Sequence, residues 1–367
     1  MHGGPADAID LKALGRVLVV KLRHHGDVLL ASPVFTVLKN HAPQAEIDAL
    51  VYADTQEMLS QHPAISQLHG IDRKWKSAGT LSRALSEGSL YRTLRSRRYD
   101  LLVHLSDQVR GAWLARMLGC RYAVAPERAH SAGHTAGRGF WSRSFTHRYP
   151  LVGRRHAVEL NLDALRRIGI QPSAAERGLV LVPGEQAQAR VADLLRSEGV
   201  PDEDFVHLHP ASRWRFKCWT VEGTAALIDR LHADGQRVVL TAAPERGELD
   251  LVAAIRGRCA SAPANLAGKL SLKMVAALAA RAKLFVGVDS APMHIAAAMG
   301  TPVVALFGPS GETEWHPWGV AHRIVSSRVH PCRPCGEDGC GGGKLSECLT
   351  SIAPETVLAA VHSLLRQ

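Results

Sequence analysis

The chain has 367 residues, of which 46% are hydrophobic and 21% charged, and its formal net charge at pH 7 is +10. This length suits two domains of ordinary size, and the apolar content is sufficient for buried cores. No apolar run approaches the ~18 residues of a membrane span, and the first residues lack the apolar segment of a secretory signal, so we expect a cytoplasmic protein.

The excess of positive charge is confined to the first half. Residues 1–170 contain 24 Lys and Arg against 14 Asp and Glu, whereas residues 171–367 contain 20 of each. Such a basic surface either serves solubility alone or meets an anionic partner such as a phosphorylated sugar or lipid head groups. Nucleic acid is not an expected partner, because the familiar binding motifs are absent and the basic residues are not interleaved with aromatic ones.

Strand and helix patterns alternate through the first half. Short apolar, β-branched runs predict strands, and i, i+3, i+4 spacing predicts helices between them. Repetition of this unit favours an α/β fold with a parallel, doubly wound sheet. The expected strands are 16–22, 46–52, 65–71, 99–105 and 122–125, and the expected helices are 28–40, 54–61, 81–98, 109–118 and 156–168.

Two stretches without clear periodicity divide the pattern. Residues 126–150 are rich in Gly, His, Arg and Ser, and form either a loop beside a site or a solvated connection. Residues 169–187 contain turn residues and are expected to link the two halves. A second series follows, with strands 205–209, 237–242, 284–288 and 301–307, helices 221–233, 245–258, 272–282 and 292–299, and a turn at 265–268.

This organisation predicts two doubly wound halves with a cleft between them. The expected domains are residues 1–175 and 176–350. Residues 351–367 are expected to form a C-terminal helix that could pack back on the first domain.

Polar side chains follow the first strand, at a turn that contains Gly26. A glycine between a strand and a helix lets the backbone approach a ligand closely. Asp27 either caps the following helix or presents its carboxylate at the carboxyl edge of the sheet, where open α/β sheets bind ligands.

The stretch from Leu284 to Ser310 is the strongest single signal in the chain. A buried strand ends in Asp289 and Ser290, and Pro292 stands where a helix would begin, with Ser290 as a suitable cap. The N-terminus of a helix attracts anions through its free N–H groups and its dipole. We expect Asp289, Ser290 and His294 to surround the diphosphate of a nucleotide.

A basic segment follows the strand at 205–209. Arg213, Arg215 and Lys217 either form a solvated patch or neutralise phosphate charge as a leaving group departs. Lys217 is preferred for that role, because its aromatic neighbours indicate partial burial. The hydroxyl of Ser212 could donate a hydrogen bond to a phosphate.

Two carboxylates lie in the strand-to-helix turn at 241–248. Glu245 and Glu248 are either ordinary partners of the helix dipole or include the residue that holds both hydroxyls of a ribose.

Metal-binding patterns are few. Cys332, Cys335, Cys340 and Cys348 lie in one loop and could hold a structural zinc ion, although their spacing is not the usual paired one. Residues 202–204 spell Asp-Glu-Asp, but this triplet precedes a strand and is expected to be a polar turn. No dinucleotide fingerprint or P-loop is present.

Taken together, the motifs resemble glycosyltransferase family 9, the heptosyltransferases of lipopolysaccharide core synthesis, and in detail the heptosyltransferase III branch. The matching stretches are KLRHHGDVLLASP, HPASRWRFKCW, NLAGKLSL, VGVDSAPMHIAAAMGTPVVALFGP and the cysteine loop followed by SIAPETV. The resemblance implies a GT-B fold, in which two Rossmann-like domains flank an interdomain cleft, with the acceptor on the first and the donor on the second.

The resemblance also implies a reaction. It indicates an inverting, metal-independent transfer of heptose from ADP-L-glycero-D-manno-heptose to the inner core of lipopolysaccharide. The enzyme would work without a cofactor and lie peripherally at the cytoplasmic face of the inner membrane, against its anionic surface. Alternatives are a heptosyltransferase acting on a protein or another glycan, or a catalytically silent protein that binds a nucleotide sugar.

Individual roles follow from the same resemblance. Asp27 matches the catalytic base, with Arg23 and Gly26 beside it on the acceptor side, and Lys217 matches the lysine at the donor phosphates. Ser290 replaces a commoner threonine, and Pro292 replaces a less rigid residue. Either Glu245 or Glu248 matches the ribose carboxylate, with Glu248 preferred. The implied donor-binding set is Ser212, Arg213, Lys217, Glu248, Leu270, Asp289, Ser290, Ala291, Pro292 and His294.

Overall fold

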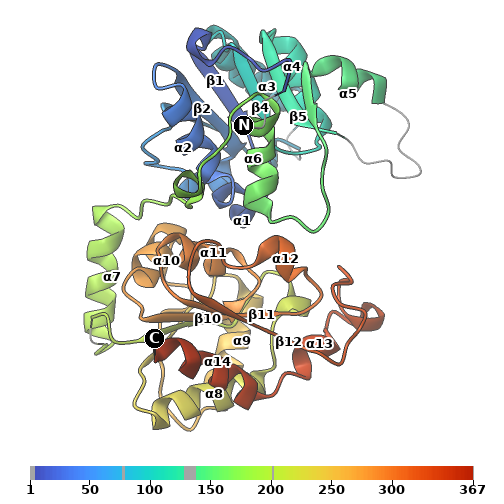
Figure 1. Cartoon of the computed structure of the whole chain (residues 1–367). Coiled ribbons are helices and arrows are strands. Elements are labelled where there is room, and N and C mark those ends of the chain that lie inside the picture. Colours follow the sequence, from blue (N-terminus) through green and yellow to red (C-terminus); the bar gives the residue numbers. More distant parts are fainter. Residues whose placement is uncertain (1–4, 77–78, 128–137, 201, 367) are drawn as a thin grey trace. The chain divides into compact units, whose positions relative to one another are not determined.

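The computed structural model describes residues 5–76, 79–127, 138–200 and 202–366. The chain divides into two compact units, Met1–Val180 and Leu181–Gln367, whereas the sequence predicted a boundary after residue 175. Each unit is built on a six-stranded sheet with helices on its faces (Figure 1). The predicted α/β class with two doubly wound parallel sheets is confirmed.

The first sheet has the order β3-β2-β1-β4-β5-β6, with all neighbours parallel. Its first strand is therefore central, and the chain moves outward to one edge before crossing back to build the other. The strands are β1 (Arg16–Val20), β2 (Glu46–Tyr52), β3 (Gln67–Ile71), β4 (Leu101–His104), β5 (Tyr122–Pro126) and β6 (His147–Tyr149).

Helices cover both faces of this sheet. Leu18 and Val20 of β1 pack in one core cluster with Ala112 and Ala115, which places α4 on that face beside α3 and α5. On another part of the unit, α2 packs against α6. The helices are α1 (His25–Leu29), α2 (Ser32–His41), α3 (Thr80–Ser96), α4 (Val109–Leu118), α5 (Arg138–Ser144) and α6 (Ala157–Arg167).

The second sheet repeats the plan, with the order β12-β11-β10-β7-β8-β9 and parallel pairing throughout. Its first strand, β7, is again central. The strands are β7 (Val206–His209), β8 (Val238–Leu240), β9 (Ala264–Asn265), β10 (Leu284–Val288), β11 (Val303–Phe307) and β12 (His322–Ser326).

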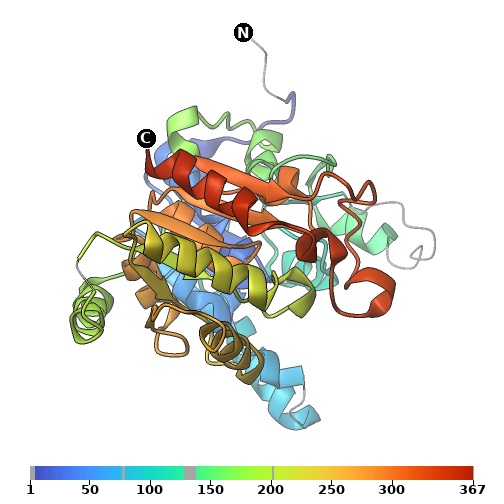
Figure 2. The same ribbon diagram turned by 90° about the horizontal axis from the view of Figure 1, so that it is seen from below.

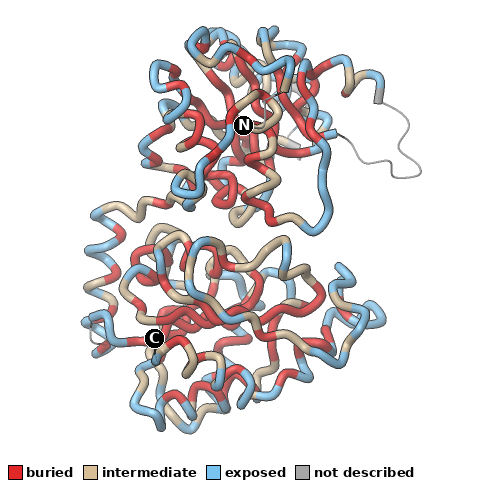
Figure 3. The backbone as a smooth tube through the Cα atoms, viewed as in Figure 1, coloured by how far each residue is buried: buried red, intermediate tan, exposed pale blue. Residues whose placement is uncertain are grey.

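Alternation along the strands explains why both faces of this sheet are covered. In β10, Val286 belongs to one core cluster and Phe285 to another, since successive side chains of a strand point to opposite faces. Strands β7, β8, β10 and β11 are buried along their whole length (Figure 3). The helices are α7 (Glu185–Ser197), α8 (Val221–Ala233), α9 (Arg246–Arg256), α10 (Leu272–Ala279), α11 (Ala291–Ala298), α12 (Glu312–Trp315), α13 (Glu347–Thr350) and α14 (Pro354–Leu365).

The C-terminal helix α14 belongs to the second unit. It lies along α8 and β12, and Figure 2 shows α14 (red) beside α8 (yellow). Val357, Val361 and Leu364 recur at helical spacing and are buried in the core of that unit. These residues form an apolar stripe along one face of α14 that packs against the core of the second unit.

Local differences from the predicted elements have simple causes. The helix expected over 28–40 is two helices, because Pro33 lacks an N–H and stands in the first turn of a new helix, α2. Within 126–150, the region expected to be a loop, the structure has α5 and β6, while residues 128–137 lie outside the described part. Strands β9 and β12 and helix α7 were not predicted.

No helix among the described residues combines the length and apolar character needed to cross a bilayer.

Seven histidines of the described residues are buried, and burial strongly lowers the pKa of four of them. Burial lowers the pKa of His62, His104 and His209 to about 4, and it lowers the pKa of His207 well below its ordinary value. His104 fits against α4 only because residue 111 is glycine, since a Cβ there would lie 2.2 Å from the imidazole. These side chains are therefore neutral in the folded state.

We predict that acid destabilises the protein well before its carboxylates titrate. The unfolded chain binds protons on these histidines below about pH 6.5, whereas the folded chain does not until about pH 4, so the stability present above pH 6.5 is lost as pH falls through this window. Each histidine contributes about 1.4 kcal/mol per pH unit there. Urea unfolding followed by circular dichroism at pH 7.5, 6 and 5 measures the loss.

His209→Gln should reduce this pH dependence, and His232→Gln, at an exposed position, should leave it unchanged. An unfolding midpoint that stays constant between pH 7.5 and 5 would contradict the prediction.

Candidate functional site

Each sheet has one pair of neighbouring strands from which the chain continues toward opposite edges of the sheet. In the first unit this pair is β1 and β4, and in the second it is β7 and β10. Loops diverge at such a topological switch point, which leaves a crevice at the carboxyl ends of the strands where α/β proteins bind ligands. Most of the predicted site residues follow these four strands.

In the second unit an ion pair spans the switch point. Nζ of Lys217, which follows β7, lies 2.6 Å from Oδ2 of Asp289, which follows β10. Asp289 is buried, and the side chain of Lys217 is 24% exposed. The sequence assigned these two residues to one site, and the structure brings their charged groups into contact.

Two hydrogen bonds connect the segment around Lys217 to the C-terminal part of the chain. Ser346 donates a hydrogen bond to the carbonyl of Phe216 at 2.7 Å, and the indole of Trp219 donates to the carbonyl of Ile352 at 3.1 Å. Phe216 and Trp219 are both buried. Lys217 is thus a half-exposed cation on a fixed backbone, which limits the entropy lost when it binds an anion.

Helix α11 begins at Ala291, directly after Asp289 and Ser290. Pro292 is in its first turn as predicted, and Gly300, with φ +81°, follows its C-terminus. Ser290 occupies the N-cap position, but its hydroxyl makes no capping bond and instead donates to the carbonyl of Val288 at 3.2 Å. The prediction that the Ser290 side chain caps the helix is therefore wrong, because its extended backbone turns the hydroxyl back to the strand.

His294 lies deeper than the sequence suggested. His294 is a residue of α11 with a buried side chain, and its ring centroid is 6.5 Å from that of Trp315 on α12. Helical spacing places residue 294 on the same face as the buried Ala297, one turn later.

The loop between β7 and Lys217 presents the other predicted phosphate ligands. The Ser212 hydroxyl is partly exposed and accepts a hydrogen bond from the backbone N–H of Trp214 at 3.3 Å. Arg213 is exposed, with its guanidinium 5.3 Å from the ring centroid of Trp214. Both side chains belong to the carboxyl end of β7, as predicted.

The two candidate ribose carboxylates differ in their surroundings. Glu248 is buried in the first turn of α9 and accepts a hydrogen bond from the N–H of Ala243 at 2.9 Å, and burial raises its pKa. Glu245 is the exposed N-cap residue of the same helix. Leu270 follows β9 and packs on the core cluster formed by α7 and α10.

A buried polar cluster beneath these loops was not predicted. Thr241 lies between two histidines, with its Oγ1 at 2.7 Å from Nε2 of His207 and 2.8 Å from Nδ1 of His209. The cluster ties β7 to the end of β8. The signal was present in the sequence, since two histidines alternate in an otherwise apolar strand.

The switch point of the first unit carries a second ion pair. Nη2 of Arg23, after β1, lies 2.6 Å from Oδ1 of Asp107, after β4, and both side chains are exposed. The side chain of Gln108 donates to the carbonyl of Leu22 at 2.8 Å. The two loops are therefore connected by side chains as well as by the sheet.

Asp27 is the third residue of α1 and is half-buried. The N-cap residue of this helix is His24, so Asp27 is not its cap. Among the described residues no hydrogen bond or ion pair engages the Asp27 carboxylate.

Lys21, six residues before Asp27, was not predicted to belong to the site. Lys21 is buried and donates to the carbonyl of Leu105 at 3.0 Å and to Oδ1 of Asn161 at 2.9 Å. Burial lowers its pKa to about 8, while the charge of Asp27 acts in the opposite direction. The signal for Lys21 was a single charge inside the apolar run that forms β1.

The cysteine loop has four free thiols, of which only Cys348 is buried. Burial raises the pKa of Cys348. Within the described ranges, no group of three or more His, Cys, Asp or Glu side chains is arranged to hold a metal ion. The Asp202–Asp204 triplet, predicted to be a polar turn, pairs with Arg281 and Lys283 at the opposite edge of the sheet.

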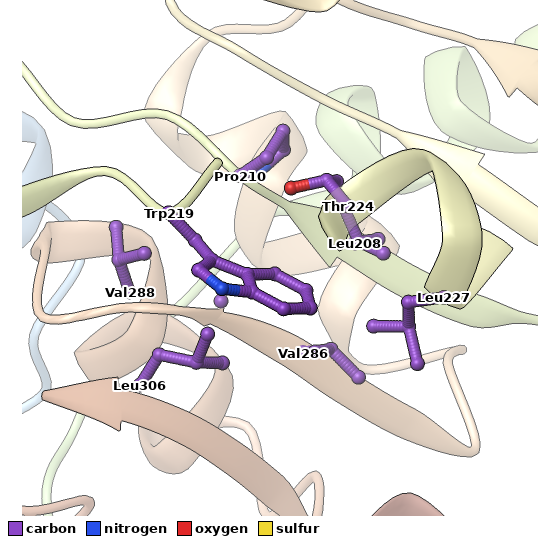
Figure 4. Close-up of a pocket in the computed structure, with 9 residues that line it drawn as sticks. Leu208, Pro210, Trp219, Thr224, Leu227, Val286, Val288 and Leu306 are labelled. Atoms are coloured by element: carbon purple, nitrogen blue, oxygen red, sulfur yellow. The ribbon is translucent and has the colours of Figure 1, made fainter. Parts of the chain in front are cut away.

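A small pocket lies beside the switch point of the second unit (Figure 4). Its lining is apolar apart from the Thr224 hydroxyl and the indole nitrogen of Trp219, and it contains none of the charged groups described above. It is therefore a packing feature and not a seat for an anion. The lining residues are Leu208, Pro210, Trp219, Thr224, Leu227, Val286, Gly287, Val288 and Leu306.

Comparison with known proteins agrees with this geometry. The profile of glycosyltransferase family 9 (heptosyltransferase) matches residues 88–346. The chain is 39% identical over 298 residues to lipopolysaccharide heptosyltransferase 3 of Escherichia coli, covering 81% of this chain and 84% of that protein.

Two solved structures share the fold. The glycosyl transferase family 9 protein of Veillonella parvula has a TM-score of 0.82 at 24% identity, covering 98% of this chain and 99% of that one. The E. coli heptosyltransferase WaaC with ADP-2-deoxy-2-fluoro heptose has a TM-score of 0.67 at 20% identity, covering 96% and 99%.

We predict that Lys217 and Asp289 are energetically coupled. Lys217→Met should lower the free energy of unfolding by about 1–3 kcal/mol, because it leaves the buried Asp289 carboxylate without its counter-charge, with partial exposure of Lys217 reducing the cost. Adding Asp289→Asn should recover part of the loss. Urea unfolding of the two single variants and the double variant measures the coupling, and strictly additive effects would contradict it.

Proposed function

The chain belongs to glycosyltransferase family 9, the heptosyltransferase family, and on that premise we propose that it transfers heptose from ADP-L-glycero-D-manno-heptose to the inner core of lipopolysaccharide. The relative of highest identity named above carries lipopolysaccharide heptosyltransferase in its name, and a structural neighbour was solved with an ADP-heptose analogue. The observation in this chain that supports the proposal is the Lys217–Asp289 pair beside the start of α11.

The second unit would hold the donor. Lys217, the exposed Arg213 and the N-terminus of α11 supply positive potential for a diphosphate, and the Ser212 hydroxyl supplies a donor. Asp289 neutralises Lys217 in the free protein and aims its ammonium group. The remaining residues of the proposed donor set are Glu248, Leu270, Ser290, Ala291, Pro292 and His294.

The first unit would supply the base. Asp27 takes the proton from the acceptor hydroxyl as that oxygen attacks the anomeric carbon, and the bond from this carbon to the ADP oxygen breaks. Direct displacement by the acceptor inverts the configuration at that carbon. Arg23 and Gly26 lie beside Asp27 on the acceptor side.

Departing ADP carries the negative charge that the reaction generates. Lys217 and the α11 N-terminus would stabilise that charge as the bond breaks, which is the electrostatic part of catalysis. These protein groups can serve the role that a divalent cation fills elsewhere, so we propose a mechanism without a catalytic metal. Zinc at the cysteine loop, if bound, would be structural.

Replacement of the base is the direct test. Asp27→Asn should lower kcat by about 10²–10⁴-fold, because the amide cannot accept the proton, while leaving ADP affinity unchanged. The assay follows ADP release from ADP-heptose with a lipopolysaccharide core acceptor, in parallel with a polypeptide acceptor and in the presence of a chelator. Asp10→Asn, at a carboxylate that caps a short helix before β1, should behave as the wild type.

Near wild-type turnover by Asp27→Asn would remove this residue as the base. Binding of ADP-heptose without ADP release from any acceptor would identify a silent binding protein instead.

The ribose carboxylate can be identified by a matched pair of variants. Glu248→Gln should weaken ADP binding about tenfold, since one hydrogen bond to a charged group is lost, whereas Glu245→Gln should change it less than twofold. Titration calorimetry with ADP gives both affinities. The reverse order would assign the ribose to Glu245, whose exposed carboxylate stands one helical turn earlier.

A further inference from the structure

Large apolar side chains lie exposed on one face of α4. Val109, Trp113 and Met117 are 42%, 55% and 45% exposed. They recur at intervals of four residues and so lie on the same side of the helix, turned away from Ala112 and Ala115, which pack into the core. Large apolar side chains that lie together and exposed on one face of a helix indicate a contact with another surface.

Neighbouring helices hold this face in place. Tyr91 of α3 donates a hydrogen bond to the carbonyl of Met117 at 2.8 Å, and Arg110 of α4 lies 3.1 Å from Glu87 of α3. The ring of Trp113 packs on Phe140 of α5, with 4.7 Å between ring centroids. The face is therefore ordered before any partner arrives.

The part of the sequence that carries α3, α4 and α5 is rich in arginine. Residues 80–149 contain twelve arginines, no lysine and four acidic residues, a net charge of +8 out of +10 for the chain. Among the acidic residues, Glu87 is bound by Arg83 and Arg110, and Asp107 by Arg23.

Two exposed arginines border the apolar side chains. Nη1 of Arg95 contacts the Tyr91 hydroxyl at 2.8 Å, and the guanidinium of Arg116 lies 5.4 Å from the centroid of Phe140. Arginine suits phosphate, because its planar fork can donate two hydrogen bonds to it.

We propose that this face, formed by Val109, Trp113 and Met117 with Arg95 and Arg116, docks on an anionic lipid bilayer. Trp and Met would enter the boundary between head groups and acyl chains, and the arginines would bind lipid phosphates. A second copy of the chain fits less well, because pairing the face with itself would bring arginines together. The inference rests on the proposed function to the extent that docking delivers the enzyme to a membrane-anchored acceptor.

Vesicle co-sedimentation of the full chain tests the proposal. Trp113→Ser with Met117→Ser should lower partitioning onto vesicles of phosphatidylcholine and phosphatidylglycerol by about tenfold or more, because two apolar side chains no longer transfer into lipid. The matched control is Val329→Ser with Leu345→Ser, at exposed apolar positions of the second unit, and it should change partitioning less than twofold.

A second variant, with its own control, tests the contribution of the arginine charges to vesicle binding. Arg95→Gln with Arg116→Gln should lower binding to the anionic vesicles by about tenfold and leave binding to pure phosphatidylcholine unchanged. Arg246→Gln with Arg258→Gln, both highly exposed on the second unit, is the control.

Wild-type partitioning by both variants of the α4 face would overturn the proposal. So would a change in self-association by sedimentation velocity with unaltered lipid binding, which would assign the face to a second copy. Heptose transfer to a delipidated core oligosaccharide provides the independent readout. If transfer fails while vesicle binding follows the face, the proposed function is wrong and the docking surface stands.

Discussion

The position of the first strand in each sheet is the constraint on which the rest depends. β1 and β7 are central, and each sheet is completed by strands added first on one side and then on the other. Because crossovers between parallel strands are right-handed, this order sends successive loops apart at one edge of the sheet. The Arg23–Asp107 pair in the first unit and the Lys217–Asp289 pair in the second both form where those loops diverge. The topology of the sheets therefore places the charged side chains of the candidate site at these two points.

Rigidity in the second unit comes from a remote part of the chain. Ser346 donates a hydrogen bond to the backbone carbonyl of Phe216, and the carbonyl of Ile352 accepts one from the indole of Trp219. Helix α14 buries its apolar stripe against α8 and the sheet. Beneath the loops, His207, Thr241 and His209 join neighbouring strands through buried hydrogen bonds. A lysine held in this way needs no rearrangement to meet a phosphate, which is what electrostatic stabilisation of a leaving group requires.

Charge is divided between the units in a manner that suits two different partners. The second half of the chain is neutral overall and collects a few donors at one helix start, as a compact nucleotide needs. The first half carries the excess, and most of it lies in the arginines around α3, α4 and α5. A broad arginine-rich surface with exposed Trp113 is better matched to an extended anionic surface than to a single phosphate group.

The sequence by itself determined the two doubly wound sheets and the residues at their carboxyl edges, because buried parallel strands and the turns after them have strong local patterns. The order of the strands in each sheet came from the structure. The bounds of α4, α8 and β10 follow from such patterns alone. The edge strands β6, β9 and β12 were not predicted from the sequence, since they are partly exposed and owe their pairing to the strand beside them. Only the tertiary structure decided that α14 belongs to the second unit, that the Ser290 hydroxyl turns back to Val288 and that Lys21 is buried against Asn161. Each depends on contacts between residues far apart in sequence or on one backbone angle, which no local pattern encodes.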